Sequence, residues 1–214
     1  MVKDLFYASA KKYGATPETV DFYWNEVVRE YSSEGRYHHT LEHLEFVVGL
    51  LYEHRAVVRR WDILLLAAIY HDINYDTTAS DNEEQSAMIA ELHMQGLDYS
   101  PAEIKLCRKH IIATKSHLEA DYSDTNLLLD ADMAILGTDW KRYQQYSNAV
   151  RTEFSIYSDE QYSRGRKAVV QLFLMQPRIF HTEPFFERFE TQARLNLERE
   201  LAGLEEEGLI LDCF

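Results

Sequence analysis

The sequence contains few of the residues that interrupt helices. It has 4 prolines and 8 glycines among 214 residues, and no clusters of alternating β-branched side chains. Strands are usually bounded by such turn residues, so their scarcity argues against a β-rich fold. Because 46% of the residues are hydrophobic, the chain can bury a sizeable core without covalent staples. We therefore predict an all-α fold, a single-domain helical bundle that spans residues 1–214.

Cysteine and basic charge are also scarce. The two cysteines, Cys107 and Cys213, are too few for a disulfide framework and are expected to be reduced thiols. The chain has 22 Lys and Arg against 36 Asp and Glu, a net charge of −14. Bulk electrostatic binding to nucleic acid or to an anionic membrane is therefore not expected. An acidic protein that handles phosphate groups needs a local cation, from a metal or from a few placed basic side chains.

Long hydrophobic runs are absent as well. Residues 1–15 lack the uninterrupted apolar core of a signal peptide, and the apolar run at 63–70 is too short to cross a bilayer. We expect a soluble, cytoplasmic protein with no membrane partner. Its oligomeric state is left open, and a homodimer is one alternative.

The chain is organised around residues 61–76. Every residue at 63–70 is apolar or aromatic, and His71 and Asp72 follow directly. The length of this run and its Leu and Ala content favour a buried helix. Burying a His-Asp pair at the end of such a helix costs free energy unless the two side chains have polar or charged partners. The pair belongs either to a satisfied core hydrogen-bond network or to a metal site, because imidazole and carboxylate both bind divalent first-row ions.

Capping signals divide the remaining chain into helices. Pro17 after Thr16 begins one helix. Capping-box patterns occur three times, at Ser80 with Glu83, Ser100 with Glu103, and Ser158 with Gln161. The expected helices span about 17–31, 37–54, 81–96, 101–117, 139–157, 159–176 and 184–206, with a short apolar segment at 127–136 ended by Gly137.

Polar residues occur at helical spacing near the start of the second expected helix. Arg36, His39 and His43 are spaced i, i+3, i+7 and would share one face of a helix. That face either lines a cleft beside the core or forms a solvated polar edge.

A similar spacing occurs at His110, Thr114 and His117, at i, i+4, i+7. This group is either a face that contacts phosphate, with Lys115 beside it, or an ordinary polar helix surface. The spacing alone does not distinguish these alternatives.

Acidic residues interrupt an apolar segment further along the chain. Asp130 and Asp132 lie among leucines, Met133 and Ile135, where an unpaired buried carboxylate is costly. Residues i and i+2 of a helix do not face together, so one acid can reach a site while the other orients a neighbour. Glu83 begins a helix, where an acid also stabilises the dipole.

The order of these motifs resembles that of the HD-domain superfamily, the metal-dependent phosphohydrolases. Six blocks in order resemble a bacterial group described as predicted metal-dependent HD-superfamily phosphohydrolases. They are RYHHTLEH at 36–43, IYHDINYD at 69–76, NEEQSA at 82–87, IIATKSH at 111–117, LDADMAILG at 129–137 and ARLNLERELAGL at 193–204. The resemblance implies an HD-type helical domain with a metal-site core at about 36–137, on which C-terminal helices at 138–206 pack.

The resemblance also implies a metal site. By similarity, His43 is the first metal ligand, His71 and Asp72 are the HD pair, and Asp132 is the distal acid. Two imidazoles and two carboxylates suit Mn, Fe, Co, Ni or Zn better than Ca, with Mg as a further candidate. We expect a single tightly held metal.

The implied activity is hydrolysis of a small phosphoester, a nucleotide or a related metabolite, by metal-activated water. Residues 37–43 are also similar to the YHNxxH block of cyclic-nucleotide phosphodiesterases. In that comparison His39 protonates the leaving group, although Thr40 stands where asparagine is usual. Arg36, with Lys115, is expected to offset the phosphoryl charge.

The remaining roles and the competing functions stay open. Asp130 or Glu83 is expected to position the water or a ligand. One alternative is a di-iron HD-type oxygenase, which needs further histidine ligands such as His110 or His117. A second alternative is a non-catalytic HD module that binds a nucleotide.

Overall fold

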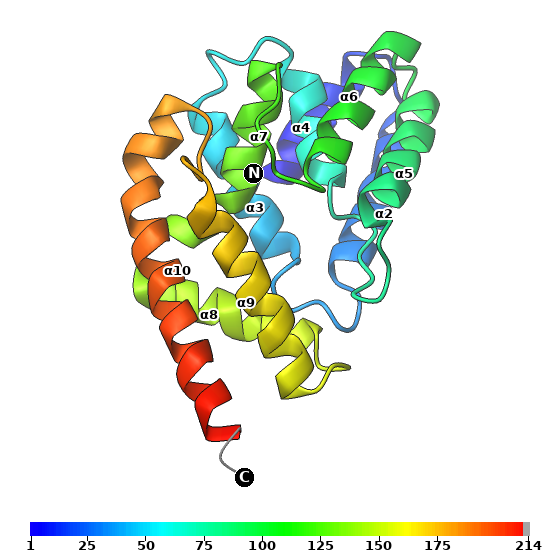
Figure 1. Ribbon diagram of the computed structural model, residues 1–214. Helices are drawn as coiled ribbons and strands as arrows, with labels where there is room; N and C mark the ends of the chain where they lie inside the picture. Colours follow the sequence, from blue (N-terminus) through cyan, green and yellow to red (C-terminus); the bar gives the residue numbers. More distant parts are fainter. Residues whose placement is uncertain (212–214) are drawn as a thin grey trace. The chain divides into compact units, whose positions relative to one another are not determined.

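The computed structural model describes the backbone of residues 1–211 and the side chains of residues 1–205. Within that range the chain forms ten α-helices and one 3-10 helix and no β-strand, which confirms the predicted all-α fold (Figure 1). The elements are α1 (Val2–Lys11), α2 (Pro17–Tyr31), α3 (Leu41–Glu53), α4 (Trp61–Tyr70), α5 (Asn82–Gly96), α6 (Pro101–Ala113), α7 (Ser123–Met133), η1 (Ala134–Gly137), α8 (Trp140–Glu153), α9 (Asp159–Met175) and α10 (Glu183–Leu211).

The helices form two compact units, residues 1–131 and residues 132–211, with the division in the last turn of α7. The prediction that residues 138–206 pack on a metal-site core stays a prediction. No described helix has the length and apolar character needed to span a membrane. Cys107 is a buried free thiol, and burial raises its pKa well above the usual range. Cys213 lies outside the described residues.

The first unit is built around α4. All residues at 63–70 are buried, and α4 packs against α1, α3, α5 and α6. Figure 1 shows α5 and α6 side by side, and they also pack closely on each other. A helix with neighbours on most sides needs apolar residues around its whole circumference, which explains the uninterrupted apolar run.

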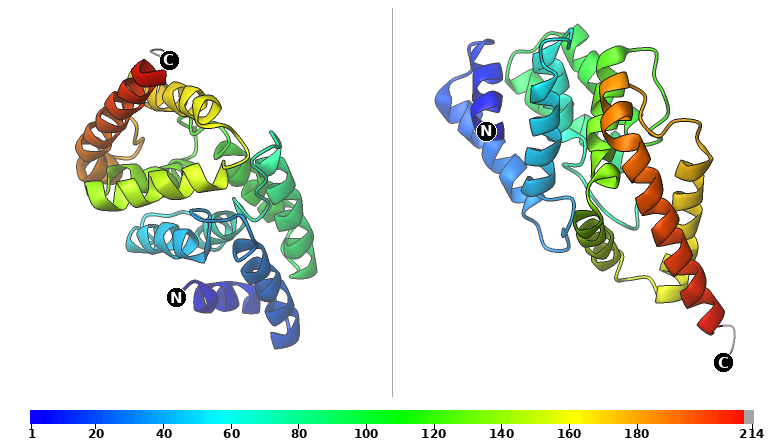
Figure 2. Two further views of the ribbon diagram at one scale, coloured as in Figure 1. Left: turned by 90° about the horizontal axis from the view of Figure 1, so that it is seen from below. Right: turned by 90° about the vertical axis from the view of Figure 1, so that its left-hand side faces the viewer.

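The second unit is built around η1 and α10. Helix α10 packs against both η1 and α9, and α8 also packs against η1; Figure 2 shows α8, α9 and α10 as neighbours. The buried Glu190 carboxylate accepts hydrogen bonds from the backbone N–H groups of Ile179 and Phe180. The Arg194 guanidinium donates to backbone carbonyls at the end of α9, including that of Gln176 at 2.8 Å. These bonds fix the connection between α9 and α10.

Gly137 allows α10 to approach η1 closely. A Cβ atom at this position would lie 2.6 Å from Phe189 Cβ and 2.7 Å from the Phe189 carbonyl oxygen. Backbone atoms cannot rotate away, so Gly137→Ala is expected to destabilise the protein by about 1–3 kcal/mol. Urea unfolding measures this cost. Gly165→Ala is the control because a Cβ there meets nothing within 4 Å; an equal loss in both variants would contradict the explanation.

Two helix boundaries differ from the predictions in a way that affects the site. Helix α3 begins at Leu41, because the Thr40 side chain caps it by accepting a hydrogen bond from Glu42 N. The earlier start predicted for this helix was wrong. Helix α6 ends at Ala113, and His117 adopts a left-handed φ of 51°. Neither predicted polar face therefore lies on one continuous helix.

The other differences in the helix boundaries are smaller. The capping boxes at residues 100–103 and 158–161 are confirmed. The one at Ser80 and Glu83 is not formed, because α5 begins at Asn82. The apolar segment at 127–136 is the end of α7 followed by η1.

Candidate metal centre

Four predicted ligands come together in the structure. One ligand atom each of His43, His71, Asp72 and Asp132 lies within 4.8 Å of the other three. His43 is in the first turn of α3, His71 and Asp72 follow α4, and Asp132 is near the end of α7. His43 and His71 are buried, and the two aspartates are partly exposed. The cluster is therefore a candidate metal site that solvent can reach.

The distances within the cluster agree with ligands of one ion. His71 Nε2 lies 3.0 Å from Asp72 Oδ2 and 3.4 Å from His43 Nε2. His43 Nε2 lies 3.8 Å from Asp72 Oδ2. Ligand atoms held about 2.0–2.2 Å from one ion are themselves about 3–4 Å apart. These three side chains thus already have the spacing of ligands of one ion, and the Asp132 carboxylate lies within 4.8 Å of them.

The hydrogen bonding of His71 fixes its tautomer. Its Nδ1 lies 2.8 Å from the carbonyl oxygen of Ala68. A carbonyl only accepts, so Nδ1 carries the proton, and in the neutral ring Nε2 then presents a lone pair. The same Nε2 atom is the one that lies closest to the carboxylate of Asp72 and the ring of His43. This arrangement of a lone pair, a carboxylate and a second imidazole favours a bound cation.

His39 lies beside the cluster without being part of it. Its Nε2 is 4.0 Å from Asp72 Oδ2. The ring stacks on Tyr75, with centroids 4.1 Å apart and planes 29° apart. Because α3 begins only after Thr40, His39 lies before this helix, where its ring also contacts those of His38 and His43. The ring keeps 20% of its side-chain surface exposed, which leaves it accessible to a substrate.

Arg36 binds the backbone around Asp72. Its Nη1 donates to the carbonyl of Asp72 at 2.7 Å, and its Nη2 donates to that of Ile73 at 2.8 Å. Nη1 also donates to the carbonyl of His39 at 3.1 Å. The guanidinium lies over two aromatic rings, those of Tyr31 and Tyr75. Arg36 therefore holds the turn that carries Asp72.

Replacing Arg36 with lysine separates this positioning role from a role of charge alone. Lysine keeps the cation but lacks the planar fork that reaches two carbonyls at once. We expect Arg36→Lys to weaken metal binding about 10–100-fold, as for other groups that orient ligands. Competition with a metal-binding dye measures the affinity. Arg29→Lys, at an exposed site on α2, is the control, and unchanged affinity in Arg36→Lys would contradict the role.

The loop that follows the metal ligands is held by α5. Asn74 N donates to Ser86 Oγ at 3.1 Å, and Asn74 Nδ2 donates to Asn82 Oδ1 at 2.9 Å. Asn82 also bonds the backbone of Asp76 in both directions, accepting from its N–H and donating to its C=O. Two residues of the segment 82–87 thus stabilise this loop.

Asp124 is a buried residue whose role sequence reasoning missed. Its carboxylate accepts hydrogen bonds from the backbone N–H groups of Arg59 and Arg60, at 3.0–3.1 Å. These groups lie just before α4, where the first N–H groups of a helix lack partners. Asp124 therefore connects the first turn of α7 to the helix that ends at the metal ligands. A Ser-Asp pair at a helix start was the only available signal in the sequence.

Three further predicted residues have defined surroundings. Asp130 is fully buried in α7. Glu83 is in the first turn of α5, and its carboxylate lies 3.9 Å from Lys115 Nζ. Lys115 Nζ is also 2.7 Å from Glu84 and 2.6 Å from the carbonyl of Ser80. Lys115 is thus bound to the start of α5, and the catalytic roles of Asp130 and Glu83 stay predictions.

His110 and His117 do not belong to the four-residue cluster. His110 is fully buried, and its Nδ1 lies 2.8 Å from Thr125 Oγ1. Burial lowers the pKa of His110 to about 4, so the ring is neutral at neutral pH. A neutral imidazole can also bind a metal, so the prediction of one ion rather than two stays a prediction.

No protein-family model, curated protein or solved structure matches this chain. The described residues form an all-helical protein with a His/His/Asp/Asp group that could hold a metal ion, in which both histidines are buried. The resemblance to the HD-domain superfamily therefore contributes only to the proposal that follows.

Proposed function

We propose that the protein is a metal-dependent phosphohydrolase of the HD-domain type that hydrolyses a small phosphoester, a nucleotide or a related metabolite. The observation that carries the proposal is the convergence of His43, His71, Asp72 and Asp132 within 4.8 Å. Three separate segments supply these residues in the order that the family resemblance implies, a histidine, then the His-Asp pair, then the distal aspartate. Two imidazoles and two carboxylates suit a first-row transition ion such as Mn, Fe, Co, Ni or Zn.

A divalent ion bound here would lower the pKa of a water molecule and stabilise negative charge on a phosphoryl group. The protein residues hold the geometry for this chemistry. Arg36 fixes the backbone of Asp72, and a backbone carbonyl fixes the tautomer of His71. His39, stacked on Tyr75, protonates the departing oxygen, because an imidazole is a suitable general acid near neutral pH.

Phosphate release from a panel of small phosphoesters tests this proposal. The protein is first stripped with chelator, and Mn, Co, Zn or Mg is then added back separately. The panel holds p-nitrophenyl phosphate, nucleoside monophosphates and nucleoside triphosphates. We expect no release from the stripped protein and restored release with at least one transition ion. Turnover that survives chelation, or none with any ion, would contradict the proposed function.

A further inference from the structure

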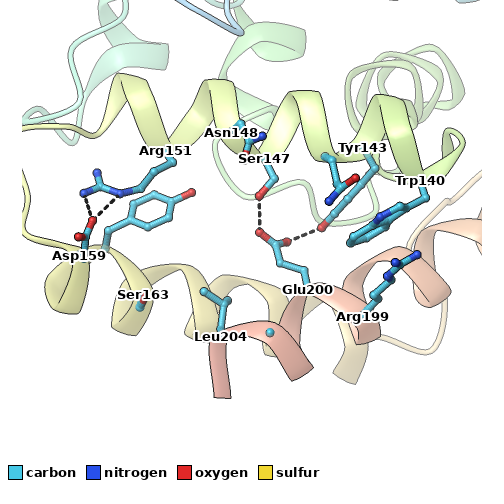
Figure 3. Close-up of a pocket in the computed structure, with 13 residues that line it drawn as sticks. Trp140, Tyr143, Ser147, Asn148, Arg151, Asp159, Ser163, Arg199, Glu200 and Leu204 are labelled. Carbon is cyan, nitrogen blue, oxygen red and sulfur yellow. Dashed lines mark hydrogen bonds and ion pairs between the residues drawn. The ribbon is translucent and has the colours of Figure 1, made fainter. Parts of the chain in front are cut away.

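The second unit contains a cavity that the metal centre does not use. It has a volume of about 660 Å³, within the usual range for small-molecule sites. Helix α8 forms one wall, and α9 and α10 form the other (Figure 3). Trp140 and Arg199 lie at one end, Arg151 and Asp159 lie at the other, and Glu200 lies between them.

The carboxylate of Glu200 is already fully hydrogen-bonded. It accepts bonds from Arg166 Nε at 3.0 Å and Nη2 at 2.9 Å, from Ser147 Oγ at 2.7 Å, and from the Tyr143 hydroxyl. Four donors use the lone pairs of a carboxylate. Glu200 therefore has no acceptor left for a cationic ligand.

The remaining charges leave the cavity with one surplus cation. Arg151 is paired with Asp159 at 2.5 Å, and Arg166 is paired with Glu200 at 2.9 Å. Among the residues whose side chains are described, no carboxylate pairs with Arg199. Its guanidinium instead lies 4.0 Å from the centre of the indole ring at the same end of the cavity. A chain of net charge −14 thus presents a local positive group beside an aromatic ring.

Polar side chains without hydrogen bonds to described residues also line the cavity. The Tyr162 hydroxyl is buried and has no hydrogen-bond partner within the described part of the chain. The side chains of Gln144, Asn148 and Ser163 also line it and form no hydrogen bonds to described residues. Buried polar atoms normally have partners, so the Tyr162 hydroxyl suits a polar ligand. Gln144 and Asn148 are exposed and Ser163 is half-buried, so their side chains offer further donors and acceptors where the cavity meets solvent.

We propose that this cavity binds a small planar heterocycle that carries a phosphate group, of the size of a nucleoside monophosphate. The anionic group pairs with Arg199, and the ring packs against Trp140, which is partly exposed. The amides and hydroxyls of the cavity bond the edges of the ring. The proposal does not depend on the phosphohydrolase activity, because none of the metal ligands lines the cavity.

Calorimetric titration of the full chain with AMP, in the presence of chelator, tests the proposal. Wild type and Asp72→Ala should bind AMP with equal affinity, and Arg199→Gln should bind it about tenfold more weakly because a charge-assisted contact is lost. Adenosine should bind wild type and Arg199→Gln alike. Arg188→Gln removes the same charge from an exposed position of α10 outside the cavity and should leave AMP affinity unchanged.

Each contrary result overturns the proposal. It fails if wild type binds no AMP, or if Arg188→Gln weakens binding as much as Arg199→Gln does. Loss of AMP binding in Asp72→Ala places the nucleotide at the metal centre and also rejects the cavity. Binding of inorganic phosphate as tight as that of AMP shows a simple anion site and removes the role of the ring. A failed phosphohydrolase assay has no bearing on these results, so the two proposals can fail separately.

Discussion

Asp72→Ala is expected to abolish metal-dependent phosphate release while leaving the helical fold intact. The Asp72 carboxylate lies 3.0 Å from His71 Nε2 and 3.8 Å from His43 Nε2. Its loss removes one of only two anionic ligands, and the ion is then held weakly. A metal contributes several kcal/mol to hydrolysis, so turnover should fall at least about a thousandfold.

The fold of this variant should survive because the Asp72 side chain is 20% exposed and lies beyond the end of α4. Far-ultraviolet circular dichroism checks this point. Asp76→Ala is the matched control, since Asp76 is exposed and its carboxylate accepts hydrogen bonds from Thr78 in the same loop. The control should keep its turnover. Undiminished turnover in Asp72→Ala, or an equal loss in both variants, would exclude the proposed role of Asp72.

Arg166→Ala is expected to cause the largest loss of stability in the second unit. The side chains of Arg166 and Glu200 are 8% and 10% exposed and form two hydrogen bonds with each other. Removing the guanidinium leaves a buried carboxylate without its cation, which costs about 3–5 kcal/mol. For a chain of this size, each kcal/mol lowers the thermal midpoint by about 2–4 °C.

Two comparisons isolate the buried ion pair. Arg164→Ala breaks the exposed pair with Glu160 and should change stability by at most about 1 kcal/mol. Replacing both Arg166 and Glu200 with apolar residues of similar size should recover most of the loss, because no unpaired charge remains. Equal stability of Arg166→Ala and Arg164→Ala would show that the buried pair is not a major contributor.

The same ion pair predicts the direction of pH dependence. Burial acts to raise the pKa of Glu200, but hydrogen bonds and charge from Arg166 outweigh burial, so the pKa falls below its usual value of 4.5. The unfolded chain therefore binds a proton at Glu200 before the folded protein does. This contribution to stability is complete above pH 4.5 and is lost as the pH falls through the lower folded pKa. In Arg166→Ala that acid-dependent loss should be smaller.

The four candidate metal ligands were selected by the family resemblance, and local signals in the sequence support three of them. His71 and Asp72 follow an apolar run that predicts a buried helix, and Asp132 interrupts another apolar segment. The position of His39 could not be predicted in the same way. The helical periodicity around His43 suggested an earlier helix start, but the Thr40 cap ended that periodicity. The capping bond of Thr40 therefore leaves His39 before the helix, where its ring stacks on Tyr75.

Interactions between residues distant in the sequence were not predictable. The bonds from Arg59 and Arg60 to Asp124 span 65 and 64 residues, and the Arg166–Glu200 pair spans 34 residues. Neither has a spacing or composition that distinguishes it from exposed charges on an amphipathic helix. The sequence does not reveal which carboxylates are buried, because burial depends on how the helices pack.

The elemental metal content of protein purified without chelator tests the central claim most directly. Wild type should contain about one transition-metal ion per chain, as expected for a single His/Asp site, and Asp76→Ala should match it. Asp72→Ala and Asp132→Ala should each lose the ion while keeping their helical content. Wild type that holds no metal, even after addition of Mn, Co or Zn, would contradict the account and assign His71 and Asp72 to a core hydrogen-bond network.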